Sequence, residues 1–150
     1  MRKPPSIETT GDVIRVLSVT AIEDDHSALD RMLPPPKWIV SKSLTLAAGL
    51  AQLRKRVLPP LVLCERDLFP GSWREMLDGI KHMSDPPLLI VTSRLADEQL
   101  WAEALNLGAY DVLAKPFEVS EVNRILSLAW LHWRRLHEGV QQLNAFATAS

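Results

Sequence analysis

Lys115 stands where a side chain could do chemistry. It follows a short β-rich run, 110–114, and precedes Pro116. Proline has no backbone N–H to give to a sheet, so the strand must end there. In a parallel α/β sheet, the carboxyl ends of the strands form the edge where ligands bind. The position therefore predicts an ammonium group lying over whatever side chains end the neighbouring strands.

Acidic and hydroxyl residues follow three other apolar runs. Glu23, Asp24 and Asp25 come after the first run, Glu65 ends the third, and Thr92 or Ser93 ends the fourth. Strands that run parallel bring their carboxyl ends to one edge, so these residues should meet Lys115 there. The alternative reading of the acids is simpler, because negative side chains also suit the N-terminus of a helix.

The elements that must position these residues alternate along the chain. The predicted strands are 13–20, 37–41, 61–64, 88–91 and 110–114. The predicted helices cover about 26–33, 44–54, 73–80 and 96–107, and a last one begins near Ser120. Ser43 and Ser72 are the predicted caps of two of them. Five βα units favour an α/β fold with a five-stranded parallel sheet, a flavodoxin-like doubly wound (βα)5 arrangement in strand order 2-1-3-4-5.

Composition limits the function classes. The chain has 150 residues, with 47% hydrophobic and 23% charged residues, which suits one globular domain. A net charge of −1 gives no general attraction to nucleic acid or to an anionic membrane. The single cysteine, Cys64, cannot form an internal disulfide and fits a cytoplasmic protein. We expect a flexible N-terminal tail over 1–12, a domain over 13–138 and a C-terminal tail over 139–150, with the four histidines facing solvent.

Three segments carry a resemblance to a known family. They are 61–71 (LVLCERDLFPG), 90–93 (IVTS) and 108–117 (GAYDVLAKPF). The chain resembles the receiver (CheY-like) domain of two-component response regulators from about Val13 to Leu136. The resemblance implies that an aspartate ending the third strand accepts a phosphoryl group from a histidine kinase and that two acids after the first strand hold Mg²⁺. It further implies that Thr92 and Lys115 contact the phosphate and that the Lys115-Pro116 bond is cis.

The chain departs from the family pattern at the acceptor. Glu65 occupies the phosphoacceptor position, although counting back from Pro70 reaches Arg66 instead. Asp67 is the alternative acceptor. A glutamate places a permanent negative charge near the site of the phosphoryl group, so Glu65 could mimic a partly activated state.

The acid pair and the aromatic switch also differ. An ungapped match to the family places Thr20 and Ala21 at the positions of its two metal-binding acids. Glu23 and Asp24 fill that role only if the loop is rearranged. Mg²⁺, bound by Glu23, Asp24 and Glu65, is the one possible cofactor. The aromatic switch position holds Val112, with Tyr110 two residues earlier.

These features favour an atypical receiver that signals by protein contact and is not an enzyme. Its partner would be a signalling protein, a histidine kinase, or a second copy through the fourth helix, fifth strand and fifth helix. The candidate interface residues there are Trp101, Tyr110, Trp130 and Trp133. The alternative is a Mg²⁺-dependent phosphorelay receiver with Asp67 or Glu65 as the acceptor. A flavin- or nucleotide-binding enzyme is disfavoured, because 20–25 has no glycine and its acids repel phosphate.

Overall fold

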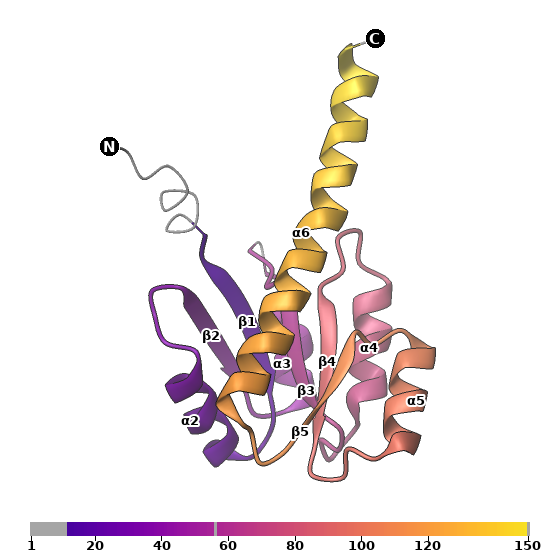
Figure 1. Ribbon diagram of the computed structural model, residues 1–150. Helices are drawn as coiled ribbons and strands as arrows, with labels where there is room; N and C mark the ends of the chain where they lie inside the picture. Colours follow the sequence, from indigo (N-terminus) through magenta and orange to yellow (C-terminus); the bar gives the residue numbers. More distant parts are fainter. Residues whose placement is uncertain (1–11, 56, 150) are drawn as a thin grey trace, which may run out of the picture.

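Parallel strands form the centre of the chain in a computed structural model that describes residues 12–55 and 57–149 (Figure 1). The strands are β1 (Ile14–Val19), β2 (Trp38–Ser43), β3 (Leu61–Glu65), β4 (Leu88–Ser93) and β5 (Asp111–Ala114). Every neighbouring pair is parallel, and the order is β2-β1-β3-β4-β5. The predicted fold class and strand order are confirmed. The sheet therefore has one edge at which all five carboxyl ends meet.

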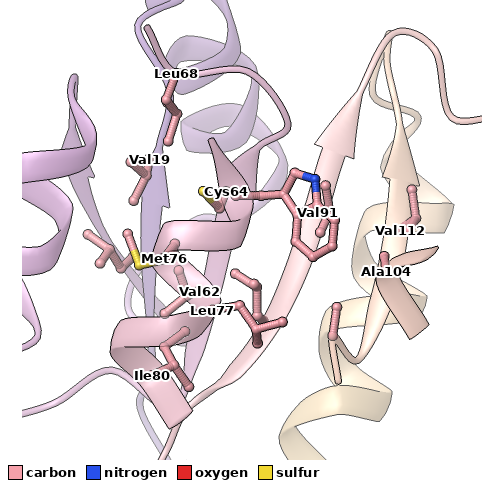
Figure 2. Packing of buried hydrophobic residues seen from close by; sticks show 14 of the residues in the cluster. Val19, Val62, Cys64, Leu68, Met76, Leu77, Ile80, Val91, Ala104 and Val112 are labelled. Carbon is pink, nitrogen blue, oxygen red and sulfur yellow. The ribbon is translucent and has the colours of Figure 1, made fainter. Parts of the chain in front are cut away.

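Helices cover both faces of this sheet. They are α2 (Glu23–Met32), α3 (Leu46–Gln52), α4 (Trp73–Lys81), α5 (Glu98–Leu107) and α6 (Val119–Ala149). One buried cluster joins the strands to α4 and α5, with side chains of α3 packed against it, and Figure 2 shows part of it. A second cluster joins the other sheet face to α2 and α6. Successive strand residues alternate between them, as Val16 and Leu17 do, because strand side chains point to opposite faces.

Local sequence explains most helix ends. Ser72 caps α4 as predicted, and its hydroxyl and the Glu75 carboxylate form a capping box. Gly108 ends α5 with a positive φ of 115°, a conformation that favours glycine. The prediction that Ser43 caps α3 is wrong. Ser43 is the last residue of β2, and the cap is Thr45, whose Oγ1 accepts a hydrogen bond from the Ala48 N–H at 3.0 Å.

The last helix continues beyond residue 138, the predicted end of the domain. It has 31 residues, which span about 46 Å at the α-helical rise. In Figure 1 it runs along the sheet and continues well past it. The helix therefore passes Gly139 and occupies most of the segment predicted as a C-terminal tail. Apart from Asp12, the predicted N-terminal tail lies outside the described residues.

None of the helices in 12–55 and 57–149 combines the length and the apolar character that a membrane crossing needs.

Candidate functional site

Lys115 lies at the centre of the charged groups at the carboxyl edge of the sheet. It follows β5 directly, and its backbone N–H donates to the Ser93 carbonyl at 3.0 Å. The Lys115-Pro116 peptide bond is cis, as the resemblance implied. Its side chain is only 3% exposed, and its Nζ lies 2.5 Å from Oδ2 of Asp25 and in contact with Oε1 of Glu65. We call Asp25, Glu65 and Lys115 the lysine cluster.

Glu65 ends β3 beside Thr92 of β4, its register partner. Its side chain is 12% exposed. One carboxylate oxygen contacts Lys115, and the other accepts a hydrogen bond from the Arg66 N–H at 3.0 Å. Both oxygens are therefore engaged with partners inside the domain. A buried carboxylate needs such partners, because it loses its hydration on folding.

Asp25 completes the cluster, and the sequence analysis did not select it as a metal ligand. Helix α2 begins at Glu23, three residues earlier than predicted. Glu23, Asp24 and Asp25 therefore all fall in its first turn. Glu23 and Asp24 are exposed, whereas Asp25 is buried. Asp25 lies four residues before Leu29, a core residue of the same helix, and residues four apart share one helix face. That spacing was the signal that could have identified it.

The predicted Mg²⁺ ligand set does not form. Glu23 and Asp24 are exposed, and no group of three or more His, Cys, Asp or Glu side chains within the described part of the chain could hold a metal ion. Mg²⁺ needs near-octahedral oxygen ligands. The two inward carboxylates, from Asp25 and Glu65, instead share the Lys115 ammonium as their cationic partner. The residues in this arrangement do not fit the ion.

A second hydrogen-bond network adjoins the cluster. His26 is 1% exposed, so the prediction that it faces solvent is wrong. Its Nε2 lies 2.9 Å from the Thr20 carbonyl oxygen, and its Nδ1 lies 3.2 Å from Oγ of Ser18. Because a carbonyl can only accept, Nε2 carries a proton and donates it to the Thr20 carbonyl. This network fixes the end of β1, and Oγ1 of Thr20 lies 3.4 Å from Oδ2 of Asp25.

The two candidate switch positions before Lys115 point to different faces. Val112 belongs to the buried cluster on the α4 and α5 side, whereas Tyr110 packs against the cluster on the α2 and α6 side. Tyr110 precedes β5, so the alternation of a regular strand does not extend to it. Its ring centroid lies 5.6 Å from that of His132 on α6. Partial burial, helped by the Asp111 carboxylate, raises the pKa of the Tyr110 hydroxyl above its usual value.

Known proteins share this architecture, although no protein-family model matches the chain. The transcriptional regulatory protein KdpE of Staphylococcus aureus is 27% identical over 107 residues, which cover 69% of this chain and 46% of KdpE. The KDP operon transcriptional regulatory protein KdpE of Escherichia coli K12 is 28% identical over 115 residues, which cover 75% of this chain and 50% of that protein. A CheY-like response regulator receiver domain protein from Methanospirillum hungatei has a solved structure with a TM-score of 0.72 and 18% identity, covering 83% of this chain and 98% of that one. The chain therefore has the fold of a receiver domain, and its sequence is similar to that of response regulators. It spans about half the length of the curated relatives it matches.

A shallow cleft of about 250 Å³ opens above the lysine cluster. Its lining includes Thr20, Glu65, Asp67 and Lys115. Asp67, the alternative acceptor, has a side chain that is 58% exposed and lies 3.9 Å from the Arg66 guanidinium. The carboxylate contacts of Lys115 are to Asp25 and Glu65. Asp67 thus lies on the rim of the cleft, and Glu65 lies at its base beside the lysine.

The predicted interface aromatics fall into two groups. Trp101 on α5 is 49% exposed. Trp130 and Trp133 on α6 stack with ring centroids 5.6 Å apart, and His137 stacks on Trp133 at 3.7 Å. Tyr110 joins the second group through its contact with His132 on the same helix.

Proposed function

We propose that this receiver signals by protein contact and does not depend on phosphorylation, because Glu65 stands in place of the phosphoacceptor. The observation that carries the proposal is the contact of the Glu65 carboxylate with the Lys115 ammonium in a buried setting. The lysine whose partner would be an acyl phosphate already holds a carboxylate that belongs to the chain itself. The negative charge at this place is therefore permanent.

The bonding of Glu65 also opposes its use as a nucleophile. A carboxylate oxygen that attacks a phosphoryl donor must leave its present partners, and here one oxygen holds an ammonium and the other a backbone N–H. Charge-assisted hydrogen bonds of this kind are about twice as strong as neutral ones. The absence of a fitting Mg²⁺ arrangement among the described acids adds to this, because a metal would otherwise neutralise the incoming phosphoryl charge.

The proposed output is a partner protein that docks on the surface formed by α5, β5 and α6. Trp101, half-exposed on α5, is the proposed anchor, since tryptophans are enriched among the residues that dominate binding energy. Receivers are signalling domains, and we assign this one no enzymatic activity. The free thiol of Cys64 accords with the reducing cytoplasm.

Intact-protein mass spectrometry after incubation with acetyl phosphate and Mg²⁺ tests the proposal. We expect the mass of the wild type to stay unchanged. Glu65→Asp shortens the side chain by one methylene and restores the family's acceptor. A gain of one phosphate by that variant alone shows that the remaining site is competent and that Glu65 removed the chemistry.

The second candidate function is a phosphate-accepting receiver, favoured by the place of Asp67 on the rim of the same cleft. Phosphorylation of the wild type would overturn the proposal. Asp67→Asn and Glu65→Gln, made in parallel, then identify the acceptor as the residue whose loss abolishes the mass gain. A beryllofluoride response with Mg²⁺ in the wild type would point the same way.

A further inference from the structure

Apolar residues recur along α6 at alternating spacings of four and three. These residues are Val122, Leu126, Ala129, Trp133, Leu136, Val140, Leu143 and Ala147. Such a repeat, with an average period of 3.5 residues, is the seam of a coiled coil, in which positions a and d face a partner helix. In this register Leu136 and Leu143 are d positions, and Val140 is an a position.

The domain uses only the first half of this stripe. Val122, Leu126 and Ala129 are fully buried against the sheet. Trp133 is partly buried, and Leu136 is 50% exposed. The stripe therefore leaves the core near Leu136. Figure 1 shows that the C-terminal part of α6 continues past the sheet. Beyond Glu138 the positions follow from the periodicity of a helix that continues to Ala149.

We propose that the C-terminal part of α6, from Leu136 onward, forms a parallel two-stranded coiled coil with a second copy of this chain. This interface lies on the part of α6 from Leu136 onward and does not include Trp101, the proposed anchor of the docking surface. It also does not depend on whether Glu65 accepts phosphate, so the two proposals can fail independently.

The residue types on the stripe argue for a second identical helix in parallel orientation. A β-branched residue at a combined with leucine at d favours two parallel strands, and Val140 between Leu136 and Leu143 has this pattern. The nearby charges lie off the seam, because Arg134, Arg135 and Glu138 fall at positions b, c and f. Two copies can therefore approach along the stripe without placing like charges against each other.

The C-terminal part of α6 also needs a partner that buries its apolar stripe. Its first half is held by the sheet, so the nucleus that a free helix must form is already present. The extension itself is weak as a single helix, because glycine at position 139 is a poor helix former and Leu136 is half-exposed to water. Burying the leucines and valine of the stripe against their counterparts offsets both terms.

Cysteine cross-linking tests the register and the orientation. Leu136→Cys places a thiol at a d position, where the two copies of a parallel pair approach within the distance of a disulfide. The native Cys64 is buried in the core and will not compete (Figure 2). We expect a disulfide-linked dimer in mild oxidant from Leu136→Cys. The matched control is Leu128→Cys, since Leu128 lies on the same helix with 49% exposure but at position c. Equal cross-linking of the two variants, or no cross-linking of Leu136→Cys, would overturn the proposal.

Sedimentation equilibrium of the full chain measures the dissociation constant of the proposed dimer. The wild type should dimerise, and Leu136→Glu should raise the dissociation constant at least tenfold, while Leu128→Glu should leave it nearly unchanged. Circular dichroism verifies that both variants fold, which the exposure of both leucines favours. A wild-type monomer at high concentration would refute the coiled coil. So would a dimer that resists Leu136→Glu and dissociates with Trp101→Glu, because the contact would then lie on the α5 surface.

Discussion

Two aspartates of helix α2 each pair with a lysine from another element, and the two pairs differ mainly in burial. Asp25 pairs with Lys115 and Asp30 with Lys42, and the distance from Nζ to Oδ2 is 2.5 Å in both. The side chains of Lys115 and Asp25 are 3% and 13% exposed, whereas those of Lys42 and Asp30 are 44% and 47% exposed. The same two residue types at the same separation thus meet in two different environments.

The environments decide what each pair does. Two unit charges 4 Å apart interact by about 1 kcal/mol in water and by about 4 kcal/mol at the effective dielectric of a protein surface region. Burial also strips hydration from each ion, so a buried ammonium cannot remain without a partner. Lys115 accordingly has two carboxylates, and the structure fixes all three groups. The exposed pair has solvent as an alternative partner and constrains nothing.

Removing the buried ammonium should give the largest effect. Lys115→Met keeps an unbranched side chain, one atom shorter, but leaves the carboxylates of Asp25 and Glu65 without a cation. Breaking a buried ion pair from one side costs about 3–5 kcal/mol. We expect a loss of this size in the free energy of unfolding, measured by urea denaturation at neutral pH. A loss below about 1 kcal/mol, the range of surface ion pairs, would show that water reaches the cluster and that the contrast with the exposed pair is not real.

The fold was readable from the sequence because its signals are local and repeated. The apolar runs 61–64 and 88–91 have no alternation, as buried parallel strands require, and both lie in the sheet centre. Gly108 and Ser72 marked helix ends by their own backbone and side-chain chemistry. Ser43 misled because a hydroxyl before a helix suits a cap, but the β2 strand extended two residues further than predicted and took it.

The site was only partly readable because side-chain direction depends on tertiary context. Glu65 and Lys115 lie at the predicted strand ends and meet there, since a residue that ends a strand has only one edge to occupy. The residue of β4 that lines the cleft is Ser93 and not Thr92. Among three consecutive acids, only the helix phase decides which one faces the sheet, and an error of three residues in the start of α2 hid Asp25. His26 was misassigned for the same reason: a polar ring reads as exposed unless its partners Ser18 and Thr20 are known.

A third acidic group sharpens the comparison, because it is exposed yet held by local bonds. The Glu75 carboxylate accepts from the Ser72 hydroxyl at 2.9 Å and from the Ser72 N–H at 2.6 Å. These hydrogen bonds lower the pKa of Glu75 below its usual 4.5, and the bond from the Ser72 hydroxyl has the largest effect. A lowered folded-state pKa stabilises the fold above about pH 4.5, and the contribution is lost as pH falls through the folded value.

Ser72→Ala should therefore cost about 1 kcal/mol at neutral pH, the usual value of a helix cap. The difference between wild type and variant should shrink under acid conditions, where Glu75 is protonated, without vanishing, because the bond from the Arg74 N–H to the Ser72 hydroxyl is lost at every pH. Urea denaturation at neutral and at acidic pH measures it. A difference independent of pH would show that the carboxylate takes no part in the cap.

The smallest effect should come from the exposed pair, and its salt dependence makes it the decisive partner of the Lys115 experiment. Lys42→Met should change the free energy of unfolding by less than about 1 kcal/mol, the typical limit for surface ion pairs. In about 1 M salt, where the screening length is about 3 Å, even that difference should disappear, while the loss from Lys115→Met should persist because ions do not reach a buried pair. Urea denaturation of both variants at low and high salt makes the comparison. If salt reduced both losses alike, the lysine cluster would behave as a surface ion pair despite its burial. That result would contradict the proposal that Lys115 holds Glu65 in place of a phosphate.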